Sequence, residues 1–62
     1  MKKVMADTTN GIFSVESFDS DCEVISQSNF VASLDTLEAG EIIGAEIDEK
    51  TEAILYAEYG IH

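Results

Sequence analysis

The chain contains no proline, no tryptophan and no arginine, and it has only one cysteine and one histidine. A single cysteine cannot form an internal disulfide, and one cysteine with one histidine cannot supply the four ligands of a common structural zinc site. A 62-residue chain buries only about 60% of the surface that its unfolded form exposes. Since an internal disulfide and a structural zinc site are excluded, we expect oligomerisation or docking on a larger partner to add stability.

Long apolar runs are absent as well. The first residues, Met1–Met5, resemble the start of a signal peptide, but the polar residues of segment 7–10 interrupt any apolar core. No run approaches the roughly 18 apolar residues that a membrane span requires. We therefore expect a cytoplasmic protein, in a bacterial or an infected host cell, with Cys22 reduced.

Positively charged residues are rare in the chain. Three lysines face 13 acidic residues, which gives a formal net charge of −10. Direct binding to nucleic acid or to anionic lipid is excluded, because phosphate contacts require Lys and Arg. An apolar content of 45% is too high for a disordered acidic tail. We interpret residues 1–62 as a single small acidic domain.

Two segments share one layout, residues 4–15 and residues 45–56. Each begins with apolar residues, continues with an aspartate and several polar residues, and ends with residues that favour strands. Asp7 and Asp48 can accept hydrogen bonds from the backbone of a turn, and Asn10-Gly11 can adopt positive φ angles. The pattern predicts two β-hairpins, turning near residues 7–11 and 48–52.

The segment 49–59 fits two structures. Asp48 as an N-cap and Gly60 as a stop favour a helix, whereas the alternation of side chains favours a strand. We favour the strand, with Leu55 and Tyr59 on its core face. Ile54 and Tyr56 then lie among acids on the other face, where they could anchor an interface.

The middle of the chain predicts one strand, one helix and a second strand. The first strand covers residues 22–25, with an extension towards Ala32 left open. The helix covers Ser33–Gly40 with Ser33 as N-cap, or begins as early as Ser28, and the next strand covers residues 41–47.

The expected fold is mostly β within the α+β class, in the order β-β-β-α-β-β. We expect a small, partly open five-stranded antiparallel barrel, or a twisted antiparallel sheet with one short helix. The expected core comprises Val4, Ile12 or Phe13, Val15, Phe18, Val24, Phe30, Leu34, Leu37, Ile43, Ile47, Leu55 and Tyr59.

Nothing in the sequence predicts catalysis, a metal or a cofactor. His62 stands at the end of the sequence, where little fixes its geometry, and Cys22 lies between two acids that disfavour a thiolate. A calcium loop beginning at Asp19 would need Gly and Glu where Val24 and Phe30 stand. Glycine-rich phosphate loops are absent. We expect a non-enzymatic protein without a bound cofactor or metal.

The acids themselves are the most informative feature. Twelve of the 13 lie from Glu16 onward. In extended chain, residues two apart point the same way at about 6.6–6.8 Å, so that the predicted strands would carry rows of carboxylates comparable to the phosphates of a nucleic-acid strand. The predicted partner-binding residues are Asp19, Asp21, Glu23, Glu46, Asp48, Glu49, Glu52, Ile54, Tyr56 and Glu58.

The leading hypothesis is an inhibitor that docks its carboxylate-rich face onto a basic, nucleic-acid-binding surface of a larger protein. By analogy, such a nucleic-acid mimic would suit a phage genome. Electrostatic attraction would speed this association and make it sensitive to salt. The alternative is a small assembly subunit or homodimer whose acids serve solubility only.

Overall fold

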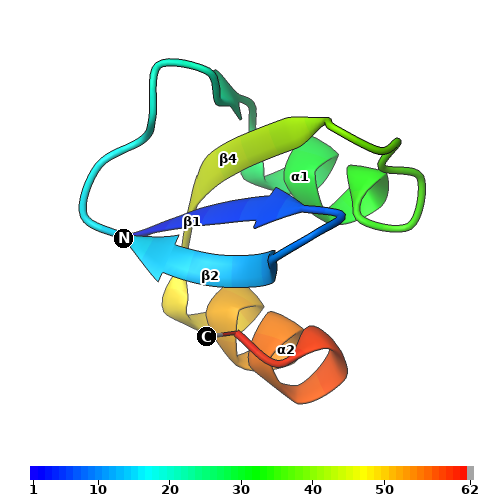
Figure 1. The fold of residues 1–62 in the computed structure, drawn as a ribbon. Coiled ribbons are helices and arrows are strands. Elements are labelled where there is room, and N and C mark those ends of the chain that lie inside the picture. Colours follow the sequence, from blue (N-terminus) through cyan, green and yellow to red (C-terminus); the bar gives the residue numbers. More distant parts are fainter. Residues whose placement is uncertain (62) are drawn as a thin grey trace.

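The computed structural model describes residues 1–61, which form an open four-stranded sheet with two helices (Figure 1). The strand order in the sheet is β2-β1-β4-β3. Strand β1 pairs antiparallel with β2 and β4, whereas β3 pairs parallel with β4. In chain order the elements are β1 (Lys2–Asp7), β2 (Gly11–Val15), β3 (Glu23–Val24), α1 (Gln27–Ser33), β4 (Ile42–Ile47) and α2 (Glu49–Tyr59).

The first predicted hairpin is confirmed. One carboxylate oxygen of Asp7 accepts hydrogen bonds from the backbone N–H groups of Thr9 and Asn10, and Gly11 adopts a φ of 80°. These local bonds close the turn and place Met5 opposite Phe13. The hairpin is therefore specified by the turn residues themselves.

The predicted five-stranded barrel, the antiparallel sheet with one helix and the second hairpin are wrong. The sheet is open and mixed, it has four strands, and two helices accompany it. Residues 49–59 form helix α2, not a strand. Asp48 begins this helix by accepting a hydrogen bond from Thr51 N at 2.7 Å, and Gly60 ends it in a left-handed conformation. The alternation that suggested a strand arises because apolar residues occur on several sides of α2.

The predicted helix Ser33–Gly40 is also misplaced, whereas the alternative start as early as Ser28 lies one residue from the observed start at Gln27. Helix α1 begins after Ser26, whose hydroxyl accepts a hydrogen bond from Asn29 N at 3.2 Å, and Ser33 is its last residue rather than its cap. The strand near residue 22 is correspondingly short, because β3 holds only Glu23 and Val24. Its extension towards Ala32 is wrong, since those residues form α1. The strand predicted at 41–47 is confirmed as β4.

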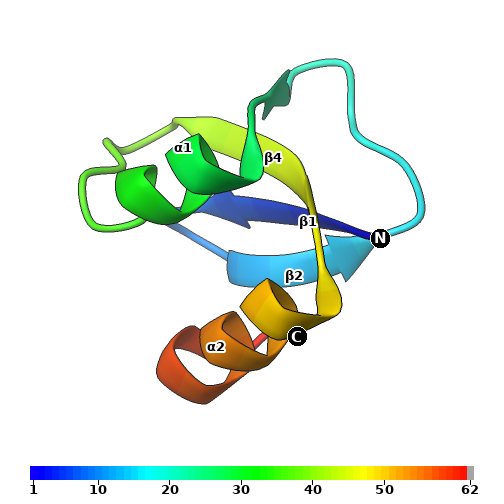
Figure 2. The same ribbon diagram turned by 180° about the vertical axis from the view of Figure 1, so that it is seen from behind.

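The core lies between the two helices and one face of the sheet (Figure 2). Each helix contributes one fully buried side chain, Phe30 from α1 and Leu55 from α2. For two residues the expected place in the core is wrong, since Val24 is 54% exposed and Tyr59 is 41% exposed. Val15, Phe18, Leu34 and Leu37 are only half-buried. The buried hydrophobic residues are Val4, Met5, Ala6, Ile12, Phe30, Ile43, Ala45, Ile47 and Leu55.

The other face of the sheet is covered in part by the crossover loop, residues 16–22, which links edge strand β2 to edge strand β3 (Figure 1). Phe18 and Cys22 of this loop pack against Gly44 in β4. A Cβ at position 44 would lie 2.7 Å from the Cys22 Sγ and 2.8 Å from the Phe18 ring. Because no side chain larger than hydrogen fits there, Gly44 lets the crossover loop dock on the sheet.

Candidate interaction surfaces

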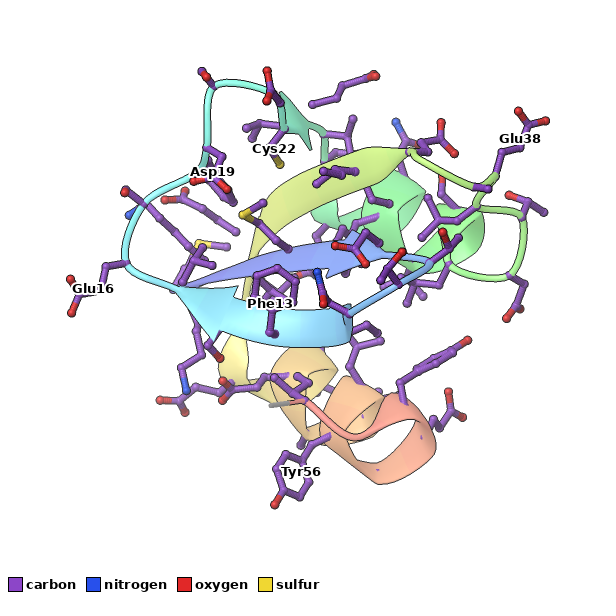
Figure 3. The ribbon with its side chains drawn as sticks, viewed as in Figure 1. Phe13, Glu16, Asp19, Cys22, Glu38 and Tyr56 are labelled. Carbon is purple, nitrogen blue, oxygen red and sulfur yellow. The ribbon has the colours of Figure 1, made fainter. Side chains whose placement is uncertain are left out.

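The ten predicted partner-binding residues do not form one surface. Asp19, Asp21 and Glu23 lie in the crossover loop and β3, at one edge of the sheet. Asp48, Glu49, Glu52, Ile54, Tyr56 and Glu58 belong to the start and body of α2. Figure 3 shows the two regions apart, with Asp19 at one end of the view and Tyr56 at the other. The remaining residue, Glu46, projects from β4 and pairs with Lys3 at 3.6 Å.

The predicted rows of carboxylates are not formed. Of Asp19, Asp21 and Glu23, only Glu23 lies in a strand. Cys22 N donates to Asp19 O at 3.1 Å, which bends the chain into a turn where the prediction placed alternating side chains. Glu52 and Glu58 stand six residues apart on a helix, and the turn of 3.6 residues therefore directs them to different sides.

The acidic edge is the first candidate surface, and we define it as Glu23, Glu38 and Glu41. Asp19 is not part of it, since Figure 3 shows Asp19 and Glu38 on opposite sides of the molecule. Glu23, Glu38 and Glu41 flank a groove of about 480 Å³ that runs between α1 and the strands β3 and β4. Ile25 and Ile43 also line this groove. Its lining is mainly polar and Ile43 is buried, so the three carboxylates are what this groove offers to the charged head of Lys or Arg.

Local hydrogen bonds hold the carboxylate of Glu41 and the backbone of Glu38. Glu41 N donates to Glu38 O at 3.0 Å, and Glu38 N donates to the Glu41 Oε1 at 3.2 Å. Sequence reasoning missed both residues, because they lack the two-residue spacing that was sought. A broader signal points to them: residues 16–41 contain seven acids and no lysine.

The α2 end is the second candidate surface. Lys2 Nζ lies 2.8 Å from Glu52 Oε2, which ties the start of β1 to α2. Beside this pair is a groove of about 500 Å³ lined mainly by apolar surface. Tyr56 is 67% exposed and Ile54 is 49% exposed. The groove is lined by Lys2, Ser14, Glu49, Glu52, Ala53, Tyr56 and Ile61.

The carboxylate of Asp48 forms hydrogen bonds within the fold and is not part of an open acidic face. Its Oδ1 caps α2 through Thr51 N, and its Oδ2 accepts a hydrogen bond from Gln27 Nε2 at 3.3 Å. Asp48 N in turn donates to Gln27 Oε1 at 2.8 Å, so that the starts of α1 and α2 are joined. The hydrogen bond from the Thr51 backbone lowers the pKa of Asp48, and the bond from Gln27 adds to this effect.

Cys22 has the environment of a packing residue. Burial raises the pKa of its thiol, and the negative charge of Asp19 raises it further. A raised thiol pKa opposes nucleophilic chemistry. No group of three or more His, Cys, Asp or Glu residues suited to a metal ion occurs within residues 1–61. The sequence-based interpretation of His62 lies outside the described residues.

Comparison with known proteins supplies no relative. No family model, no curated protein and no solved structure matches the chain. Over the described part of the chain, none of the helices has both the length and the apolar character needed to cross a membrane. Inferences about function therefore rest on the two surfaces described above.

Proposed function

We propose that this chain is a non-enzymatic binding module that docks its acidic edge onto a basic surface of a larger protein. The target surface is one that otherwise holds nucleic acid, and occupying it makes the module an inhibitor. One observation carries the proposal: residues 16–41 hold seven acids without a single lysine, and three of these acids, Glu23, Glu38 and Glu41, line the groove beside the exposed edge strand β3.

The charges of the acidic edge are not neutralised inside the molecule. The ion pairs found among residues 1–61 are Lys2–Glu52 and Lys3–Glu46, and neither involves this edge. Uncompensated charge of one sign destabilises a compact state through self-repulsion. A basic partner relieves that repulsion, and the resulting electrostatic attraction steers association.

The groove beside β3 suits the side chains of such a partner. The charged head of a lysine or arginine can reach Glu23, Glu38 or Glu41 while its stem lies beside the half-buried Ile25. Surfaces that bind nucleic acid display Lys and Arg for contact with phosphates. The same side chains are therefore available to carboxylates, and an acidic module competes with nucleic acid for them.

The test is affinity capture with a matched pair of variants. The chain is immobilised, exposed to a bacterial lysate at about 50 mM and about 500 mM salt, and the retained proteins are identified by mass spectrometry. The edge variant carries E23Q, E38Q and E41Q, and the control variant carries E16Q, E46Q and E58Q, which line neither groove. Both variants lose three charges, but only the first loses the carboxylates of the groove.

The proposal requires that nucleic-acid-binding proteins are retained at low salt, that added DNA or RNA displaces them, and that the edge variant loses them while the control retains most of them. Recovery of no nucleic-acid-binding protein at low salt would overturn the proposal. If both variants lose the captured proteins equally, binding depends only on the net charge of the chain. That result would also contradict a defined docking edge.

The exposed apolar side chains of α2 favour a second candidate, a structural subunit or homodimer whose acids serve solubility. Ile54 and Tyr56 are both largely exposed, and exposed aromatic residues are common anchors of interfaces. Sedimentation at low and high salt separates the two functions. A homo-oligomer that is insensitive to salt supports the assembly subunit, whereas a monomer at both salt concentrations supports the inhibitor.

A further inference from the structure

The groove at the α2 end has features that the acidic edge lacks. Glu49, Glu52, Ala53 and Tyr56 follow one another at spacings of three, one and three residues and therefore share one side of α2. Ser14 of β2 and Lys2 of β1 face them across the groove. Apolar surface exceeds polar surface in this lining, and the groove volume of about 500 Å³ is within the range of small-ligand and side-chain pockets.

The end of the chain completes this groove. Gly60 N donates to Tyr56 O at 3.1 Å, and Gly60 adopts a left-handed conformation that ends the helix. Ile61 then packs against the hydrophobic core and lines the groove. The groove thus combines an aliphatic residue, an exposed aromatic ring and a small residue, Ala53, that leaves room between them.

We propose that this groove binds one apolar side chain of a partner protein, flanked in the partner by lysine or arginine. The charge around the groove favours a basic partner over a second copy of this chain. Glu52 is paired with Lys2, but Glu49 forms no ion pair within residues 1–61 and stays free to meet a cation. A second copy of this chain carries a charge of −10 and would bring further carboxylates against Glu49, whereas a basic segment is attracted.

The positive charge of the partner is the part of this inference that rests on the proposed function. The two surfaces lie in different parts of the molecule, as Figure 3 shows for Glu38 and Tyr56. A partner that meets both is bound at two places, one by charge alone and one by an apolar anchor. The anchor would hold the complex at salt concentrations that weaken the acidic edge, because apolar burial is not screened by ions.

The test uses three capped pentapeptides and the 15N-labelled chain. One peptide has tryptophan between two lysines, the second has tryptophan between two glutamates, and the third has alanine between two lysines. We expect saturable shifts of the Ser14, Ala53 and Tyr56 amides with the first peptide, with about tenfold tighter binding than the second shows. The third peptide should give no saturable shift at these amides.

Two substitutions on the exposed side of α2 form a matched pair. A53W fills the groove, whereas A57W adds the same side chain one turn later, at an exposed residue outside the groove lining. We expect A53W to weaken binding of the first peptide at least about tenfold, and A57W to change it by less than about twofold. Circular dichroism checks that both variants keep their helices. Should A53W fail to fold, Y56S removes the aromatic ring and takes its place.

The outcomes separate this inference from the proposed function. Shifts confined to Glu23, Glu38 and Glu41 would overturn the groove and leave the acidic edge in place. Equal binding of the lysine and glutamate peptides, or equal losses in A53W and A57W, would also overturn it. A dimer in sedimentation that A53W abolishes would identify a second copy as the occupant and contradict the proposal. If the groove amides shift as expected while the edge variant retains every captured protein, the groove stands and the proposed inhibitor fails.

Discussion

The two ends of this molecule are both rich in carboxylates, but they differ in what accompanies the charge. Residues 16–41, which include the acidic edge, contain no lysine, whereas Lys2 and Lys50 lie at the α2 end. At the edge, three carboxylates surround a groove with no ion pair, and at α2 the groove holds the Lys2–Glu52 pair and an exposed tyrosine. Charge therefore dominates one surface, and apolar contact is available at the other.

The difference has a structural origin. The edge is assembled by β3 and the α1–β4 loop, which bring residues distant in sequence together. The α2 end is built mainly by one helix, with Lys2, Ser14 and Ile61 facing it. This helix buries a single residue, Leu55, and leaves the rest of its apolar side chains at the surface. Each surface can therefore be disrupted without direct change to the other.

The largest expected effect comes from releasing α2. Leu55 is fully buried, and L55A removes the only side chain with which α2 enters the core, so we expect unfolding free energy to fall by about 2–5 kcal/mol. Urea denaturation measures this loss. The neighbouring I54A changes a largely exposed side chain and should stay within about 0.5 kcal/mol of the parent; similar losses in the two variants would contradict the packing described for α2.

A smaller effect is expected where the crossover loop docks on the sheet. G44A places a methyl group against Cys22 Sγ and the Phe18 ring, and overpacking of this kind costs about 1–3 kcal/mol. The double variant F18A/G44A frees the space of the ring. A coupling free energy that makes the double variant less unstable than the sum of the two single variants, measured by denaturation, confirms the contact. Strict additivity would refute it.

The N-cap of α2 gives a pH-dependent prediction. The folded pKa of Asp48 is lowered from its ordinary value of 3.8. The stability contributed by its carboxylate is therefore complete well above pH 3.8 and is lost as pH falls through the lowered pKa. We expect D48A to lower the Tm by roughly 5 °C at neutral pH, with a smaller difference in strong acid. D48N can still cap the helix, so its Tm should lie between those of the parent and of D48A. A loss of Tm in D48A that is the same at every pH would contradict the role of the charge.

The smallest expected effect is electrostatic. Added salt screens repulsion among the acids of the edge, so the Tm of the parent should rise with salt. The edge variant E23Q/E38Q/E41Q should be about 2–4 °C more stable at low salt and less responsive to salt. Removing paired acids with E46Q/E52Q should give no such gain, because both lie beside lysines. Thermal melts over a salt series compare the two, and an equal gain would show that only net charge matters.

Local chemistry made part of the fold predictable. Asp7 and Gly11 carry the bonds and dihedral angle of the first hairpin themselves, and the strand at 42–47 follows its apolar pattern. Segment 49–59 satisfied two patterns at once, with the capping signals of a helix and the alternation of a strand. The sequence-based preference for the strand was wrong, because the caps at Asp48 and Gly60 and the burial of Leu55 together hold the helix.

The candidate surfaces were less predictable than the elements. Asp19, Asp21 and Glu23 are close in the chain, but the row expected for them depended on a strand, and β3 holds only Glu23 and Val24. Glu38 and Glu41 were missed, because only the path of the α1–β4 loop brings them to Glu23. Exposure of Ile54 and Tyr56 was foreseen, although on a strand face rather than on a helix.

The sequence by itself determined the net charge, the lack of disulfide and zinc staples, and the local turn at Asp7–Gly11. These are properties of composition or of neighbouring residues, and no long-range contact can change them. Only the tertiary structure decided the strand order, the approach of Phe18 and Cys22 to Gly44, and which carboxylates share a groove. Those features depend on residues far apart in the chain, whose meeting is set by the packing of the whole core around Phe30 and Leu55.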